Sequence, residues 1–288
     1  MTTLAKTENE AQDNATKLNI CLNIGFNVLN SMSTQCRRKG KQPMSHIQVR
    51  DDQGVRIISF NRPDKRNALD LNMYKQLTEY LIEGEADNDI RAFMLHGEDN
   101  CFTSGNDVAD FLKNSDLGPN HPAVRFLFCL LELKKPLVAA VSGAAVGIGT
   151  TVLLHCDLVY ADNTAKFQLP FVNLALVPEA GASLLLPELV GYQKAAELLL
   201  LGESFDANTA HRLNIINDVI AQEELLGYAL NQAKKLANQP PQALQITRQL
   251  MRPHKNRVQH QMHQELEQFS ARLKSDEAKA RFQAFLKK

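Results

Sequence analysis

Two glycine-containing loops in this chain carry residues that could bind an anion through the main chain. The first loop contains Gly147 and Gly149 and follows the apolar run 137–141, which has the pattern of a buried strand. Glycines at a strand-to-helix turn let the backbone approach a ligand closely, because no Cβ stands in the way. The first N–H groups of a helix lack an intrahelical partner, and the helix dipole favours negative charge there. This turn therefore offers main-chain donors to an anion.

Three interpretations of the Gly147 turn remain open from its residues alone: a turn that only packs, a dinucleotide site, and an oxyanion hole. The dinucleotide site fits poorly, because Val152 stands at the third glycine position and Asp162 follows too early for the usual ribose contact. An oxyanion hole needs a second N–H group from another part of the chain.

Residues 102–107 form a second loop with the same order of strand, glycine and helix start. Asp107 suits the first turn of a helix, so a plain helix cap is the simplest interpretation of this loop by itself. Together with the Gly147 turn, the loop could supply the second donor of an oxyanion hole.

These loops must be positioned by elements in which strand and helix patterns alternate. A hairpin is predicted over 47–60, and Asp70 is a good N-cap for a helix over 71–86. A helix after Pro178 should be interrupted by Pro187. Further strands are predicted at 92–95, 137–141, 158–160, 166–169 and 215–220, and further helices at 122–133, 193–201 and 207–213.

Beyond about residue 220 the pattern is helical throughout. The fold class is therefore α/β, with a core over 45–220 and a C-terminal all-helical region over 221–288. The alternating pattern begins only at Ile47, so residues 1–44 are expected to form a tail, disordered or folded as a weak helix.

Composition and charge restrict the class of protein. The chain has 288 residues, of which 44% are hydrophobic, enough to bury a sizeable core. Its 32 basic and 32 acidic residues balance, so no global field favours nucleic acid or an acidic membrane. No apolar run approaches the ~18 residues of a membrane span. The five scattered cysteines include no C-x-x-C pair, which indicates a reducing compartment, and we expect a cytoplasmic protein.

Four segments follow one another in the sequence: Asn61-Arg62-Pro63-x-x-x-Asn67-Ala68-Leu69, Phe102 to Asp107, Ser142-Gly143-x-x-x-Gly147-x-Gly149, and Cys156-Asp157-Leu158-Val159-Tyr160-Ala161. Through these segments and their order, the chain from about residue 46 to 288 resembles the crotonase superfamily, also called the enoyl-CoA hydratase/isomerase family.

The resemblance implies a crotonase-like spiral of ββα units, whose C-terminal helices pack subunits into a homo-oligomer, a trimer or a hexamer. It implies an acyl-CoA substrate, no metal, and no cofactor besides the coenzyme A of the substrate. The family's oxyanion hole maps onto the backbone N–H groups of Asn106 and Ile148, which would stabilise an enolate. Candidate substrate- or CoA-binding residues are Lys65, Arg66, Ala68, Ser104, Gly105, Asp107 and Gly147.

The resemblance also bears on the reaction. Hydratases of the family carry two glutamates that activate a water, and Thr151 and Phe171 occupy the matching positions here. Glu179 stands where Δ3,Δ2-enoyl-CoA isomerases typically have their glutamate. Its alternative interpretation is an acid in the first turn of a helix after Pro178.

The expected activity is a shift of the double bond of 3-enoyl-CoA to the 2-position, in fatty acid metabolism. Glu179 would carry the proton from C2 to C4 through a dienolate. We expect Phe171 and the run 174–177 to form apolar walls that raise the pKa of Glu179. Alternatives are another crotonase activity, such as hydration or thioester hydrolysis, and a non-catalytic acyl-CoA binder.

Overall fold

The computed structural model describes residues 45–114 and 116–286. The chain divides into two compact units, 1–44 and 45–288, and the described residues belong to the second. The tail predicted over 1–44 therefore lies outside the described residues.

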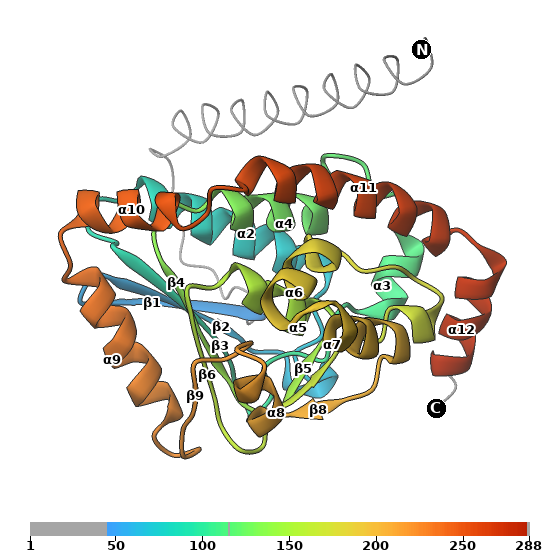
Figure 1. Ribbon diagram of the computed structural model, residues 1–288, viewed down its shortest axis with the longest axis horizontal. Helices are drawn as coiled ribbons and strands as arrows, with labels where there is room; N and C mark the ends of the chain where they lie inside the picture. Colours follow the sequence, from blue (N-terminus) through green and yellow to red (C-terminus); the bar gives the residue numbers. More distant parts are fainter. Residues whose placement is uncertain (1–44, 115, 287–288) are drawn as a thin grey trace, which may run out of the picture. The chain divides into compact units, whose positions relative to one another are not determined.

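A mixed sheet forms the centre of the described unit (Figure 1). Within the described residues it has six strands in the order β1-β2-β3-β4-β6-β9, and only the β1–β2 pair is antiparallel. The strands are β1 (Ile47–Asp52), β2 (Val55–Phe60), β3 (Ala92–Gly97), β4 (Leu137–Val141), β6 (Leu158–Ala161) and β9 (Asp218–Val219).

A smaller sheet carries the Gly147 turn. In the described part of the chain it has three short strands, β5 (Ala144–Val146), β7 (Lys166–Gln168) and β8 (Phe205–Asp206), with β7 in the middle. The sequence patterns do not predict β5 or β8, because two or three residues are too few to show a strand period. β5 matters for the site, since its end sets the position of the turn that follows it.

The helices begin and end close to the predicted positions. Asp70 caps α2, as predicted, since its carboxylate accepts from the N–H of Met73 at 2.8 Å. The helices before the C-terminal region are α2 (Leu71–Ala86), α3 (Val108–Lys113), α4 (Pro122–Glu132), α5 (Ile148–Thr151), α6 (Ala182–Val190), α7 (Tyr192–Ala196) and α8 (Ala207–Arg212). Short 3-10 turns occupy Pro63–Lys65, Val152–His155 and Val172–Leu174, and a π-helical turn occupies Glu197–Leu201.

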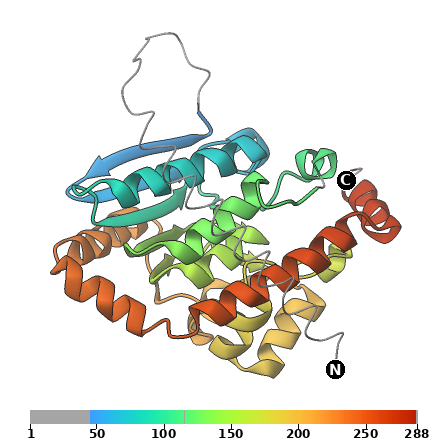
Figure 2. The same cartoon turned by 90° about the horizontal axis from the view of Figure 1, so that it is seen from above.

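The last four helices are α9 (Leu225–Ala237), α10 (Pro241–Leu250), α11 (Lys255–Leu273) and α12 (Asp276–Leu286). α9 covers one face of the main sheet, where Ala229 and Ala233 pack among Val55 and Ile57 of β2 and their neighbours. Figure 1 shows α2 and α4 on the other side of this sheet. α11 runs across α4 and α6 (Figure 2). The predicted α/β core followed by a helical region is thus observed, and both parts contribute to one packed unit.

Two sequence expectations about local structure are wrong. The helix α6 is not interrupted at Pro187, because the proline removes only its own N–H bond while Ala182 and Leu186 stay buried in the core. The run 215–220 forms a strand only at Asp218–Val219, because the Ile215 N–H instead closes the end of α8.

In the described part of the chain, none of the helices combines the length and apolar character needed to cross a bilayer.

Candidate active site

The two glycine loops lie next to each other as parallel segments. Thr103 stands opposite Ala145 in a parallel bridge, held by backbone hydrogen bonds of 2.8 and 3.0 Å. Asn106 and Ile148 each follow three residues after this bridge, on their own segments. The two residues whose N–H groups were predicted to form an oxyanion hole therefore lie on neighbouring segments.

The Asn106 N–H group is left free by the way its loop is paired. Leu69 donates its N–H to the Gly105 carbonyl at 2.8 Å and accepts from the Asp107 N–H at 2.9 Å. In a parallel bridge of this kind, the residue between the two bonded groups directs its own N–H to the opposite side. Among the described residues, the Asn106 N–H has no backbone acceptor.

The Ile148 N–H group is free for a different reason. Gly147 donates its N–H to the Gln168 carbonyl at 2.9 Å, which continues the small sheet. α5 begins at the next residue, so the Ile148 N–H is one of the first donors of a helix and has no intrahelical partner. Within the described residues, no backbone acceptor faces it.

Both loops need glycine for geometric reasons. Gly105 has a φ of 98°, and a Cβ there would lie 2.9 Å from the Val146 carbonyl oxygen. Gly147 has a φ of 57° and a ψ of −116°, with open space around the missing Cβ. The missing Cβ of Gly105 allows the two loops to approach each other. Gly147 allows the positive φ that the turn before α5 requires.

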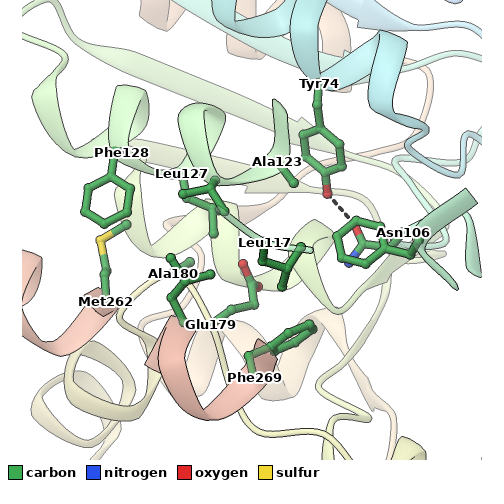
Figure 3. A pocket seen from close by; sticks show the side chains of 13 residues that line it. Tyr74, Asn106, Leu117, Ala123, Leu127, Phe128, Glu179, Ala180, Met262 and Phe269 are labelled. Atoms are coloured by element: carbon green, nitrogen blue, oxygen red, sulfur yellow. Dashed lines mark hydrogen bonds between the residues drawn. The ribbon is translucent and has the colours of Figure 1, made fainter. Parts of the chain in front are cut away.

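A mainly apolar cavity of about 40 Å³ adjoins the 102–107 loop (Figure 3). Asn106 lines it from the loop, and α3, α4 and α11 supply aromatic walls that include Phe111, Phe128 and Phe269. Glu179 is the one carboxylate in this lining. The cavity therefore combines an apolar chamber with a single group that can accept a proton.

The Glu179 carboxylate is buried, with 9% of the residue exposed. The pKa of Glu179 is raised to about 8. Desolvation is the main cause and the charge of Glu265 adds to it, while a hydrogen bond from Thr151 lowers the pKa. The Thr151 hydroxyl donates this bond to Glu179 Oε1 over 2.5 Å. A carboxyl with a pKa near neutrality can both take up and release a proton at working pH.

The walls around Glu179 differ from those predicted. Phe171 is buried, but neither it nor the run 174–177 lines the cavity. α4 and α11 take their place, because the crossing of these two helices brings apolar side chains from distant parts of the chain over the carboxylate. The expected effect on the pKa of Glu179 is confirmed in direction, although other residues cause it.

The helix-cap interpretation of Glu179 is wrong. α6 begins at Ala182, three residues later, and Gly181 is its N-cap residue. Ala180 and Gly181 both have left-handed backbones, with φ values of 60° and 75°, which turn the chain sharply after Glu179. The carboxylate is therefore directed into the cavity and makes no capping bond.

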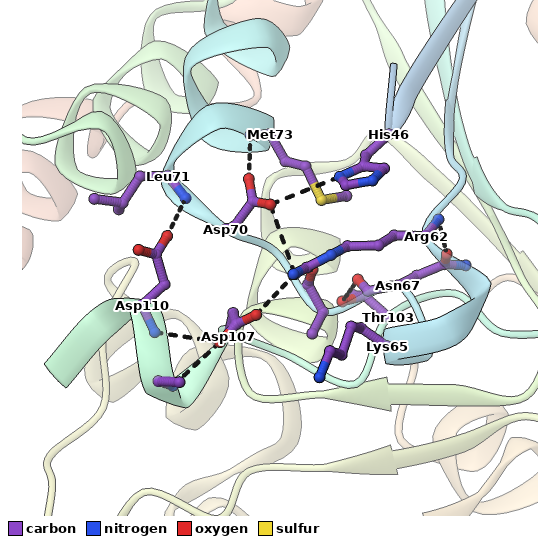
Figure 4. Close-up of polar contacts among 12 residues, drawn as sticks. His46, Arg62, Lys65, Asn67, Asp70, Leu71, Met73, Thr103, Asp107 and Asp110 are labelled. Carbon is purple, nitrogen blue, oxygen red and sulfur yellow. Dashed lines mark hydrogen bonds and ion pairs between the residues drawn. The ribbon is translucent and has the colours of Figure 1, made fainter. Parts of the chain in front are cut away.

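Asp107 has a structural position. Its carboxylate accepts from the N–H groups of Ala109 and Asp110, capping α3, and from Arg62 at 2.8 Å (Figure 4). Desolvation works to raise the pKa of Asp107, but the hydrogen bond and charge of Arg62 hold it below its usual range. Arg62 also donates to the Ala68 carbonyl, so this ion pair joins the 61–69 segment to the 102–107 loop.

The other predicted substrate-binding residues lie on the same two segments. Ser104 donates its N–H to the Arg66 carbonyl and its hydroxyl to the Lys65 carbonyl, at 3.0 and 3.2 Å. The side chains of Lys65 and Arg66 are exposed, and Ala68 is buried. The structure therefore places the segment with Lys65, Arg66 and Ala68 against the 102–107 loop, which contains Ser104 and Gly105.

Three further residues of the site were not foreseen in these roles. Thr151 was read only as an empty hydratase position, yet it bonds to Glu179. The Tyr74 hydroxyl lines the cavity and donates to the Asn106 side chain. Glu265 of α11 contacts the backbone after Glu179. Tyr74 belongs to the apolar face predicted for α2, so its burial could be expected. No signal in the sequence indicates that its hydroxyl bonds to Asn106.

The described residues contain no group of three or more His, Cys, Asp or Glu side chains arranged to hold a metal ion.

Comparison with known proteins gives a consistent result. Residues 50–288 match the enoyl-CoA hydratase/isomerase family. The chain belongs to this family. The match spans both the sheet and the C-terminal helices, so the predicted crotonase-like fold is confirmed.

Individual members of the enoyl-CoA hydratase/isomerase family differ in activity. The chain is 32% identical over 216 residues to enoyl-CoA delta isomerase 3, peroxisomal, of Mus musculus, covering 72% of this chain and 67% of that protein. It is 35% identical over 211 residues to 2,3-dehydroadipyl-CoA hydratase of Escherichia coli, covering 73% and 82%. The solved structure of OdaA of Pseudomonas aeruginosa is 40% identical, with a TM-score of 0.83, and the likeness covers 84% of this chain and 99% of that one. Family membership therefore places the chain among enzymes of acyl-CoA metabolism, while its reaction must be argued from the site.

Proposed function

We propose that this enzyme shifts the double bond of a 3-enoyl-CoA to the 2-position, with Glu179 as the single proton carrier. The observation that carries the proposal is the Glu179 carboxylate in the apolar cavity, which Asn106 also lines. An isomerisation of this kind moves one proton between two carbon atoms, so it needs one base and no second acid.

The reaction follows from the chemistry of the thioester. The C2 protons of a 3-enoyl-CoA are acidified by the thioester carbonyl and by the adjacent double bond. Glu179 removes one of them, and the electron pair spreads over the carbonyl oxygen as a dienolate. The N–H groups of Asn106 and Ile148 stabilise this oxyanion. Protonated Glu179 then returns the proton at C4, which leaves the conjugated 2-enoyl-CoA and the original carboxylate.

The environment of Glu179 supports this role. Burial raises its pKa to about 8, and thereby makes it a stronger base once ionised than an exposed glutamate. Thr151 donates to one carboxylate oxygen and keeps a fraction of the group ionised. Both features serve a base that must be charged to start the reaction and neutral to complete it.

Hydration is less well supported by the same site. Addition of water needs a group to hold and activate the water besides the group that protonates carbon. Thr151 is a hydroxyl already bonded to Glu179, and Phe171 is apolar and lies outside the cavity lining. The site therefore contains neither of the two carboxylates that a family hydratase uses, and its one carboxylate, Glu179, stands at a third position.

Substitution of Glu179 tests the proposal. Glu179→Gln keeps the size of the side chain but removes the base, so isomerisation of 3-enoyl-CoA should fall at least ~10²-fold while acyl-CoA binding is retained. Glu203→Gln is the matched control, because Glu203 is exposed. The assays follow isomerisation, water addition to 2-enoyl-CoA and thioester hydrolysis with both variants and the wild type.

Each alternative predicts a different result. A hydratase would add water to 2-enoyl-CoA faster than it isomerises 3-enoyl-CoA. A hydrolase would release free CoA, and a non-catalytic binder would bind acyl-CoA without turnover. Full isomerase activity in Glu179→Gln would end the mechanism proposed here.

A further inference from the structure

α11 extends a buried carboxylate to the backbone that follows Glu179. Glu265, which is 5% exposed, accepts from the Gly181 N–H at 2.6 Å with one oxygen. Its other oxygen accepts from the N–H and the hydroxyl of Ser183, at 2.8 and 2.5 Å. All three partners are donors, and an ionised carboxylate is the form that only accepts. Desolvation is the larger effect and raises the pKa of Glu265, while the three donors of Gly181 and Ser183 act against it and favour the negatively charged form.

The same backbone is held on its other side by His155. The His155 Nε2 lies 2.7 Å from the Ala180 carbonyl oxygen, to which it donates as the neutral Nε2–H tautomer. Desolvation lowers the pKa of His155 to about 4, so the ring is neutral at working pH. Ala180 has a φ of 60°, which an alanine rarely adopts, and such a backbone persists only where its surroundings hold it.

We propose that Glu265 is a positioning residue for Glu179: it fixes the turn that aims the catalytic carboxylate and places a negative charge behind it. The proposal rests on the proposed function in assigning the base to Glu179. Glu265 itself does not line the cavity, so it acts through Glu179 and through the backbone between them.

The charge of Glu265 has a definite direction of effect. A like charge nearby disfavours ionisation of a carboxyl group, so Glu265 raises the pKa of Glu179 beyond what burial alone produces. A base with a higher pKa removes a weakly acidic C2 proton more effectively. The position of Glu265 therefore tunes the base without adding a second acid to the cavity.

Several other charged groups on the packed elements are held in ion pairs. Exposed ion pairs join Lys255 to Glu132 of α4, Arg257 to Glu188 of α6, and Arg272 to Glu277 of α12. His263 of α11 packs against Phe128, and desolvation lowers its pKa. Glu265 is the charged group that acts on the pKa of Glu179 from α11.

A matched pair of charge-removing substitutions tests the proposal. Glu265→Gln and Glu267→Gln each remove one negative charge from α11, but Glu267 is exposed. The pH dependence of kcat/KM should show the ionisation of Glu179 moving to lower pH in Glu265→Gln, by on the order of one unit, and staying in place in Glu267→Gln. An equal shift in both variants, or a loss of turnover and Tm in Glu265→Gln with no shift, would overturn the proposal.

A second measurement does not depend on turnover. Infrared difference spectroscopy over a pH titration, with Glu179→Gln to assign the band, follows the Glu179 carboxyl directly. If the wild type does not isomerise 3-enoyl-CoA but its Glu179 band titrates at lower pH in Glu265→Gln, the proposed reaction fails and the role of Glu265 stands. If Glu265→Gln does not fold, Glu265→Asp replaces it. This variant keeps the carboxylate but moves its charge away from Glu179 by the length of one methylene group. A smaller downward shift then supports the proposal, and an unchanged Glu179 titration overturns it.

Discussion

At the Glu179 carboxylate, burial and one hydrogen bond act on the pKa in opposite directions. Desolvation is the larger effect and raises the pKa to about 8, while the Thr151 hydroxyl lowers it. The balance leaves the group able to change protonation state near neutral pH, which a proton carrier needs. A fully exposed glutamate would be ionised there and would be a weaker base.

Removal of the Thr151 hydroxyl should shift the pH profile of the enzyme. Thr151→Val takes away a donor that favours the ionised form of Glu179, so the pKa of Glu179 should rise and the acidic limb of kcat/KM should move to higher pH. Thr151→Ser keeps a hydroxyl and serves as the control, with a profile close to the wild type. An unchanged profile in Thr151→Val would show that this hydrogen bond does not act on the base.

Removal of the Glu179 charge should also stabilise the fold at alkaline pH. The folded-state pKa is raised above the unfolded value of ~4.3, so the folded protein binds the extra proton and loses stability as pH rises from ~4.3 to about 8. Glu179→Gln has no such ionisation. Its Tm should exceed that of the wild type by a margin that grows between pH 5 and pH 9. A margin independent of pH would contradict the assignment of the raised pKa.

At the scale of elements, the two oxyanion loops depend on close backbone approach. The bridge between Thr103 and Ala145 holds the loops in register, and the absence of a Cβ at Gly105 lets them come together. α5 contributes only its first N–H group, so a helix of one turn is long enough for this purpose.

Valine substitutions in the loops should misplace the donors. Gly105→Val meets the Val146 carbonyl and an unfavourable φ, so turnover should fall on the order of 10²–10³-fold, the cost typical of one lost oxyanion donor. Gly147→Val is strained by its φ alone and should also lose activity. Gly227→Val, at an exposed position of α9 with open space around it, is the control. Full turnover in both loop variants would leave these turns without a catalytic role.

α11 has a larger part in the site than its sequence indicates. Met262, Leu266 and Phe269 line the cavity, and Glu265 on the same helix holds the start of α6. α11 belongs to the C-terminal region that we expected to pack subunits together. It therefore also completes the cavity of its own chain. Changes on this helix should affect catalysis as well as assembly.

At the scale of the whole molecule, large apolar side chains stay exposed at the start of α7 and in the π-helical turn that follows it. Tyr192 is 72% exposed, Leu200 63% and Leu201 54%. Contiguous apolar exposure on a soluble protein commonly marks a contact with another chain. Because the resemblance to the crotonase superfamily implies trimers or hexamers, we predict that a second copy of this chain covers these residues.

Light scattering tests this surface. The wild type should have the mass of a trimer or hexamer, and Leu200→Glu should lower it, because a buried unpaired charge strongly destabilises an interface. Leu250→Glu is the control. Leu250 is an exposed leucine at the end of α10, so this variant shows whether the loss of mass is specific to the surface around Leu200. A monomeric wild type would contradict the prediction.

The sequence by itself determined the features that are encoded locally. Apolar periods and caps such as Asp70 predict most strands and helices, because neighbouring residues in the chain set these preferences. The glycines at 105 and 147 mark turns with special backbone angles, and the order of four motifs identified the family. These signals also pointed to Glu179, Asn106 and Ile148 as one group.

Only the tertiary structure decided what surrounds that group. The walls of the cavity come from α4 and α11, the hydroxyl that bonds to Glu179 comes from Thr151, and the second carboxylate comes from Glu265. No local pattern encodes these contacts, because they arise where helices distant in the chain cross. Desolvation and charge, and hence the pKa of Glu179, depend on that packing and not on the residues next to it in sequence.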